Sequence, residues 1–455
     1  MKEDASTADL ELPALLIDQI IGQERAVDVV RLAARQRRFV LFIGEPGTGK
    51  SLLGRAIAEL LPPTAAHCVA SVANPENPIC PRIVCRPRAE LEAGQRRLVQ
   101  KKRQEHFSHN YLLGLTALGI ILVCGWLTAR DKAYGLGLAG GLALIWLWRL
   151  KKGPAARHRT LKILVERGDL HAPFIDATAC SEGALFGDVR HDPYQSGGVE
   201  SPPHELVEPG AVHRAHGGVL YIDEIGSLSA DAQKLLLTAI QDKALPITGR
   251  QSGSSGTLIQ SEPVPCDFVL VAAGNVEDLA QITPALRSRI LGYGFEVLTA
   301  STMSDTLQHR HDLERFVAQE VKKDGRIPHF TAEAVEAIIH EARLRAGGKD
   351  RLTTRLRELG GLVRTAGDLA AQQGETIVKA AHVNTALHYA ASIEEQRAIG
   401  QASDSLNELK PKFLAPRSRI FSDPARPTDL LHQSVDPPDM GRRWPRQDAP
   451  PLHHG

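Results

Sequence analysis

Phe39-Val40-Leu41-Phe42-Ile43 runs directly into Gly44-Glu45-Pro46-Gly47-Thr48-Gly49-Lys50-Ser51, and this stretch decides the fold. Five consecutive apolar residues are typical of a strand that is buried on both faces of a parallel sheet. The apolar segment Leu52–Leu61 predicts that a helix follows. The pattern G-x-x-x-x-G-K-[ST] between a strand and a helix therefore predicts a phosphate-binding loop in an α/β fold.

The residue types of this loop explain why it would hold phosphate. Glycine lets backbone N–H groups curl around phosphate oxygens, because a Cβ would collide with the anion. The helix that starts near Lys50 adds the positive end of its dipole. We expect residues 44–51 to bind ATP, with Lys50 at the β- and γ-phosphates and the Ser51 hydroxyl on Mg²⁺. A glycine-rich turn without a ligand is the disfavoured alternative.

A second motif, Gly218-Val-Leu-Tyr-Ile-Asp-Glu-Ile225, places two carboxylates after a run of apolar residues. Ligands of open parallel sheets bind at this end of a strand. We expect Asp223 to hold Mg²⁺ and Glu224 to act as the general base that polarises the attacking water. An isolated Asp-Glu pair is usually only a solvated strand end, so this prediction depends on the phosphate loop.

A third apolar run, residues 268–273, ends in Gly274-Asn275, where the Asn275 side chain could orient the lytic water. Two arginines follow at Arg287 and Arg289. Either they are plain surface charges, or one of them completes the site of a neighbouring subunit by stabilising charge on the transferred phosphoryl group.

Two uncharged stretches, 111–129 and 133–148, interrupt the α/β pattern. The first is about 28 Å long as a helix and the second, which Leu150 extends, about 24 Å, so both approach the thickness of a bilayer core. Five Lys or Arg residues flank the pair on each outer side, whereas the linker Arg130-Asp131-Lys132 is nearly neutral. The sequence predicts a transmembrane hairpin, 111–129 and 133–150, in the cell membrane with the ATPase in the cytoplasm. A pair of buried core helices is the alternative.

Composition limits the remaining choices. Lys+Arg 54 against Asp+Glu 53 gives a net charge of +1, so no overall electrostatic field favours nucleic acid as a partner.

The changes of pattern along the chain predict its domains. We expect an α/β domain from residues 1–61 and 161–300, an insertion at 62–160, a helical lid at 301–398 and a disordered, proline-rich tail at 399–455.

These motifs together resemble the AAA+ ATPases, with Walker A at 44–51, Walker B at 219–224, sensor 1 at Asn275 and an arginine finger within 287–289. Ile20-Ile-Gly-Gln-Glu-Arg-Ala26 is similar to the segment before Walker A in Lon, MCM and Mg-chelatase relatives. The blocks 183–198, 207–218, 246–249 and 262–267 resemble the membrane-anchored, B-type Lon proteases of archaea, and this likeness covers about residues 10–398.

The resemblance implies further roles. The lid of this family supplies a sensor 2 arginine, for which Arg357 is the preferred register and Arg355 the alternative. Arg289 fits the finger pattern better than Arg287 does. The family forms hexameric rings with pore loops that grip the substrate. Phe186 is a candidate for such a loop, with an ordinary core position as the equal alternative.

The likeness ends near Ile393-Glu-Glu-Gln396, and we find no Ser-Lys peptidase site in the tail that follows. The sequence therefore predicts the motor of an ATP-dependent protease, which acts on unfolded or membrane proteins, with a separate peptidase subunit as a possible partner. A nucleic-acid motor or transcription activator of the MCM or enhancer-binding type is the main alternative. A scaffold that does not hydrolyse ATP is disfavoured, because Lys50, Asp223, Glu224 and Asn275 are all present.

Overall fold

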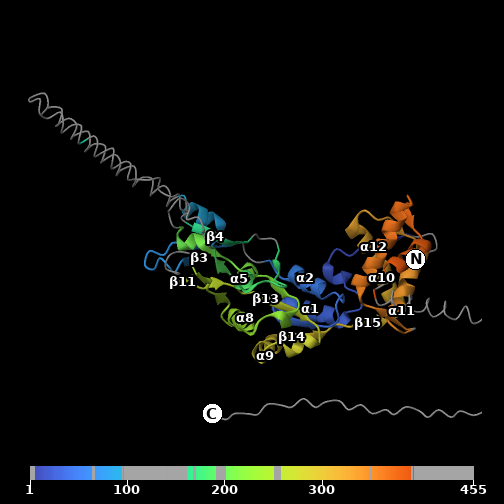
Figure 1. Cartoon of the computed structure of the whole chain (residues 1–455), viewed down its shortest axis with the longest axis horizontal. Coiled ribbons are helices and arrows are strands. Elements are labelled where there is room, and N and C mark those ends of the chain that lie inside the picture. Colours follow the sequence, from blue (N-terminus) through green and yellow to red (C-terminus); the bar gives the residue numbers. More distant parts are fainter. Residues whose placement is uncertain are drawn as a thin grey trace, which may run out of the picture. The chain divides into compact units, whose positions relative to one another are not determined.

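The computed structural model describes residues 6–63, 67–94, 96, 141, 161–167, 171–190, 201–250, 258–348, 350–390 and 393 (Figure 1). The described residues from 6 to 390 belong to the first of two units, which divide after residue 391. The predicted tail, 399–455, and the two apolar stretches apart from Gly141 lie outside the described residues.

A five-stranded parallel sheet forms the centre of the first unit, in the order β14-β1-β13-β8-β5. Its strands are β1 (Phe39–Ile43), β5 (Phe174–Asp176), β8 (Val219–Ile222), β13 (Val269–Gly274) and β14 (Gly294–Leu298). Ile43, the last residue of β1, pairs with Gly274 on one side and Leu298 on the other. The phosphate loop, Asn275 and the residues after β14 therefore leave the sheet at the same edge.

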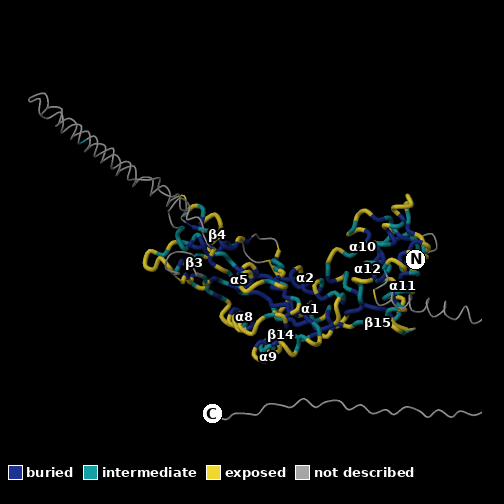
Figure 2. Tube along the Cα trace, viewed as in Figure 1, coloured by how far each residue is buried: buried dark blue, intermediate teal, exposed yellow. Residues whose placement is uncertain are grey.

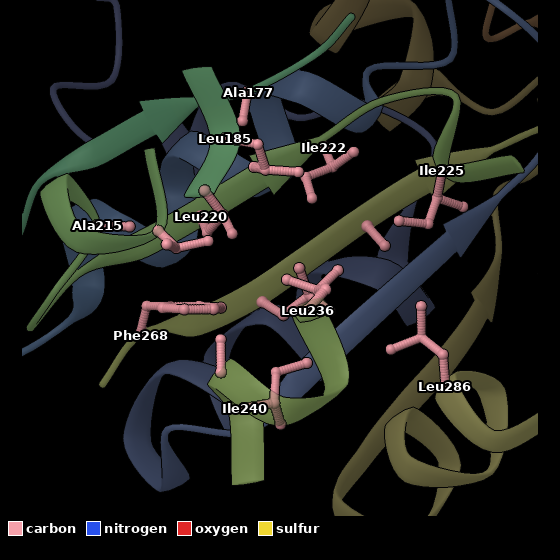
Figure 3. Packing of buried hydrophobic residues seen from close by; sticks show 14 of the residues in the cluster. Ala177, Leu185, Ala215, Leu220, Ile222, Ile225, Leu236, Ile240, Phe268 and Leu286 are labelled. Atoms are coloured by element: carbon pink, nitrogen blue, oxygen red, sulfur yellow. The ribbon is translucent and has the colours of Figure 1, made fainter. Parts of the chain in front are cut away.

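Both faces of the sheet are buried, as the apolar run in β1 predicts. Val40 and Phe42 face the cluster that includes helices α1 (Glu24–Gln36) and α2 (Lys50–Leu60). Leu41 and Ile43 face the opposite cluster, which Figure 3 shows in part. That cluster includes residues of α5 (Glu182–Phe186), α7 (Ala211–Arg214), α8 (Ala230–Asp242) and α9 (Pro284–Tyr293). Helices α8 and α9 carry exposed residues beside the buried ones (Figure 2). Alternate residues of each strand thus serve two separate cores.

A helical lid follows the sheet and has a hydrophobic cluster of its own. Its helices are α10 (Leu307–Asp324), α11 (Ala332–Arg345), α12 (Leu356–Gln372) and α13 (Ala380–Tyr389). Two short strand pairs join them, β15 (Thr302–Ser304) with β17 (Arg351–Thr353) and β16 (His329–Phe330) with β18 (Ile377–Val378). The first described residues pack on this lid. Thr7 is the first residue of the 3-10 helix η1 (Thr7–Asp9), and its hydroxyl accepts a hydrogen bond from the Phe330 N–H at 2.9 Å.

A small antiparallel sheet, β3-β2-β4, lies where the insertion leaves and rejoins the chain. Its strands are β2 (Cys68–Val72), β3 (Arg82–Arg86) and β4 (Leu161–Glu166). Because β4 pairs with β2, residues on both sides of the predicted boundary at 160 belong to one sheet. Among the described residues three pairs of short strands complete this part of the chain: β6 (Asp188–Val189) with β7 (Val207–Glu208), β9 (Ala244–Leu245) with β12 (Val264–Pro265), and β10 (Thr248–Arg250) with β11 (Leu258–Gln260). The four-residue helix α6 (Pro203–Leu206) directly precedes β7.

Candidate nucleotide-binding site

The phosphate loop has the backbone conformation that its glycines allow. Gly47 and Gly49 both have φ of +86°, a region that L-residues with a Cβ rarely adopt. Gly49 is the N-cap of α2, and no side chain caps the helix. A Cβ at Gly49 would meet no described atom within 4 Å. The first N–H groups of α2 thus have no side-chain cap among the described residues, which suits the binding of a phosphate anion.

Lys50 is the buried cation of the site, with 7% of its surface exposed. Its Nζ donates hydrogen bonds to the carbonyl oxygens of Gly44 at 2.6 Å and Glu45 at 3.2 Å. Burial lowers the pKa of Lys50 below its ordinary value, and the Asp223 and Asp278 carboxylates oppose that shift. The ammonium is thus held at the loop by two carbonyl oxygens, and the carboxylates after β8 and β13 act on it electrostatically.

The two carboxylates after β8 lie at the same edge of the sheet. The Asp223 N–H donates to the Thr178 hydroxyl at 3.1 Å, which ties this strand end to the residues after β5. Glu224 is exposed and has φ of +53°, a left-handed conformation that is uncommon for a residue with a Cβ. Such conformations cost roughly 1–3 kcal/mol and cluster at functional sites. The next residues form the 3-10 helix η5 (Ile225–Ser227).

A cavity of about 550 Å³ joins the phosphate loop to two further strand ends. Its lining includes Gly44 and Glu45 from the loop, Asn275 after β13 and Thr299 after β14. The buried Thr299 hydroxyl lies 3.0 Å from the Thr48 hydroxyl and donates to the Ile43 carbonyl at 3.3 Å. Thr299 was not predicted from the sequence. It directly follows β14, a strand that pairs with β1, and this position could have indicated that it lies near the phosphate loop.

The two candidate sensor 2 arginines both reach the loop but differ in their partners. Arg355 donates from Nε to Glu45 at 2.6 Å. Arg357 packs over the loop, because a Cβ at Gly47 would lie 3.3 Å from the Arg357 Cβ. The Arg357 charge also lowers the pKa of Lys50. Among the described residues no carboxylate pairs with Arg357, so its guanidinium is the one that remains open to an anion at the loop.

Comparison with known proteins places this site in a family. The lid residues 329–391 match the model of the archaeal LonB AAA+ ATPase lid domain. A putative Lon protease homologue of Methanothermobacter thermautotrophicus is 35% identical over 87% of this chain and 91% of its own length. The chain belongs to the archaeal Lon protease family. Archaeal Lon proteases of Thermococcus kodakarensis and Archaeoglobus fulgidus are 49% and 50% identical over 86% of this chain.

Two other family models match parts of this Lon-family chain. Residues 16–76 match the magnesium chelatase subunit ChlI and residues 203–283 match the sigma-54 interaction domain. The chain spans 62% and 63% of the length of the Thermococcus and Archaeoglobus Lon proteases.

The candidate finger arginines of this Lon-family chain lie on α9, away from the phosphate loop. Arg287 is bound to Glu296 through two hydrogen bonds, at 2.9 and 3.1 Å. The Arg289 guanidinium carbon lies 4.0 Å from the centre of the Tyr293 ring, and its Nε has no hydrogen-bond partner among the described residues. Arg289 lines a cavity of about 630 Å³ that also contains Phe39, the first residue of β1. It therefore lies at the opposite edge of the sheet from residues 44–51.

Two other sequence predictions concern segments outside this site. Phe186 is only 6% exposed and packs in the hydrophobic cluster of α5, so it is a core residue and not the pore-loop aromatic. In the part of the chain that the structure describes, no helix is both long enough and apolar enough to cross a bilayer. The predicted membrane segments 111–129 and 133–150 lie outside the described residues apart from Gly141.

Proposed function

We propose that this chain is an AAA+ motor that binds ATP and Mg²⁺ and couples ATP hydrolysis to the unfolding and translocation of polypeptides. The observation that carries the proposal is the setting of Lys50, whose buried ammonium lies at the phosphate loop under the electrostatic influence of Asp223, Asp278 and Arg357. Charged groups from the loop, two strand ends and the lid meet there, which is what phosphoryl transfer requires.

Each predicted site residue receives a role in this proposal. The N–H groups of residues 44–51 and the Lys50 ammonium would hold the phosphates, and Ser51 and Asp223 supply the oxygen ligands that Mg²⁺ prefers. Bound Mg²⁺ would neutralise charge on the β- and γ-phosphate oxygens. Glu224 would take a proton from the attacking water, Asn275 would orient that water, and Arg357 would stabilise the charge that develops on the transferred group.

The position of Arg289 supports a ring of several copies. A five-residue strand is about 16 Å long, and Arg289 lies at the end of the sheet away from its own phosphate loop. It could act only on a nucleotide that another copy holds. We propose that copies pack head to tail, as a closed ring requires, and that the ring is a hexamer.

Unfolded or membrane proteins are the proposed substrates, and the bilayer is the proposed location. The support is the pair of apolar stretches at 111–129 and 133–150 with basic outer flanks, which would anchor the motor in the cell membrane and leave its ATPase domain in the cytoplasm. Membership of the Lon family supports a protein substrate, and a separate subunit would supply the peptidase site.

A nucleic-acid motor or transcription activator is the second candidate, because residues 203–283 match the sigma-54 interaction domain. The test uses the full chain in lipid nanodiscs and measures ATP turnover with an unfolded protein or with double-stranded DNA added. Stimulation by unfolded protein alone is the expected result. Stimulation by DNA alone would overturn the proposal in favour of the second candidate.

A further inference from the structure

Asp278 is a carboxylate beside the site to which the functional proposal assigns no role. It belongs to the 3-10 helix η6 (Glu277–Ala280), which begins two residues after Asn275. Its Oδ2 accepts a hydrogen bond of 2.6 Å from the backbone N–H of Asn275. Its own N–H donates to the Asn275 carbonyl at 3.2 Å, so the two residues close a tight turn.

Asp278 also packs against the turn that follows the Glu224 strand end. A Cβ at Gly226 would lie 3.0 Å from the Asp278 Cβ and 3.1 Å from its Oδ1. A Cβ at Gly274 would lie 2.7 Å from its Oδ2. A methyl group at 274 would force the carboxylate to shift, and one at 226 would make the contact tighter than ordinary packing, so glycine at both positions suits a carboxylate between the two turns.

The charge of Asp278 reaches the phosphate loop as well. Together with Asp223 it raises the pKa of Lys50, against the effect of burial. One side chain is therefore in contact with the turn of the general base and the turn of the water-orienting residue, and it acts electrostatically on the phosphate-binding lysine.

We propose that Asp278 is a positioning residue, which holds the Asn275 backbone in register with the Glu224 turn by accepting the Asn275 N–H. The inference rests on the proposed ATPase function and deepens it. A hydrogen bond to a carboxylate is stronger than one to a neutral acceptor, and a displacement of about 1 Å at a water-positioning group is costly for turnover. Asp278 acts on the rate of hydrolysis through Asn275, and nucleotide binding depends on residues 44–51.

The test compares Asp278→Ala and Asp278→Asn in the full chain, with kcat, KM and nucleotide affinity measured separately. Asp278→Ala should lower kcat by about tenfold or more while the affinity changes by less than about threefold. Asp278→Asn keeps an oxygen acceptor for the Asn275 N–H and should restore kcat to within about threefold of the native chain. Native kcat in Asp278→Ala, or equal losses in both variants, would overturn the proposal.

A double-mutant cycle with Asn275→Ala separates positioning from a general structural effect. If Asp278 acts through Asn275, Asp278→Ala should lower kcat by less than about twofold in the Asn275→Ala background. Full additivity of the two losses would overturn the proposal. Gly226→Ala is the second variant, since its methyl group would press on Asp278 at 3.0–3.1 Å and should lower kcat in the same direction. A Gly226→Ala variant with native kcat would count against the proposal.

Two controls keep this test apart from the functional proposal. Asp231→Asn makes the same chemical change at an exposed carboxylate in the first turn of α8 and should keep native kcat. Lys50→Ala gives the background rate. If the native chain does not exceed that background rate, the ATPase proposal fails. If the native chain does exceed it and Asp278→Ala keeps the native kcat, only the role of Asp278 fails.

Discussion

Arg355, the N-cap of lid helix α12, donates a hydrogen bond from Nε to Oε2 of Glu45, the second residue of the phosphate loop, at 2.6 Å. The two residues are 310 positions apart in the chain. Both side chains are nearly half exposed, so the pair adds only about 0–1 kcal/mol to stability. The ion pair with Glu45 engages Arg355, and among the described residues it leaves the Arg357 guanidinium as the lid cation that can bind an anion at the loop.

The first prediction separates these two arginines. Arg357→Ala should lower ATP turnover by about tenfold or more, because it removes a cation at the transferred phosphate. Arg355→Ala should lower it by less than about threefold, since it removes a half-exposed ion pair. Steady-state hydrolysis by the two variants is the measurement, and the reverse order of effects would assign sensor 2 to Arg355.

The second prediction concerns the arginine on α9. Arg289→Ala should abolish most turnover, whereas Arg287→Ala should keep it, because Arg287 is already bound to Glu296. If Arg289 acts on a neighbour, rings made by co-expressing Arg289→Ala with Lys50→Ala should regain activity, since some sites then combine an intact loop with an intact arginine. Mixed rings as inactive as either variant alone would count against action between subunits.

The motifs that sequence alone could predict are those whose residues are neighbours in the chain. The strand, phosphate loop and helix at 39–61 are contiguous, and β1 and α2 form where the pattern predicts them. The contacts of Glu45 with Arg355 and of Thr48 with Thr299 join residues more than 250 positions apart. No local pattern encodes such contacts, because they depend on the strand order and on the packing of the lid.

Phe186 illustrates the same limit on one residue. An aromatic side chain followed by glycine fits a pore loop and a core position equally well in sequence. Only the packing of α5 against the sheet decides the matter, and it buries the ring. The roles of the site residues remain predictions, which the point variants test.

The third prediction concerns pH. Burial lowers the pKa of His213 to about 4, although its bond to the Leu245 carbonyl opposes the shift. An unfolded histidine has a pKa near 6.5, so the unfolded chain binds more protons between about pH 6.5 and pH 4. Stability should therefore fall as the pH falls through that window, by about 2 kcal/mol between pH 7 and pH 5 for this residue alone.

Urea denaturation of the full chain at pH 7 and pH 5 measures this effect. Burial also lowers the pKa of His216 to about 4, so the native chain should lose more than the share of His213. His213→Gln should show a smaller loss between the two pH values than the native chain does. An equal loss in the variant would mean that His213 is not kept neutral by the fold.

The central claim is that residues 44–51, Asp223 and Glu224 of this chain form an ATP-hydrolysing site. The most direct measurement is ATP binding and turnover on the same samples of the native chain, Glu224→Gln and Lys50→Ala. The native chain should bind and hydrolyse ATP, Glu224→Gln should bind it without turnover, and Lys50→Ala should lose binding. Turnover by Glu224→Gln at the native rate, or tight ATP binding by Lys50→Ala, would contradict the claim.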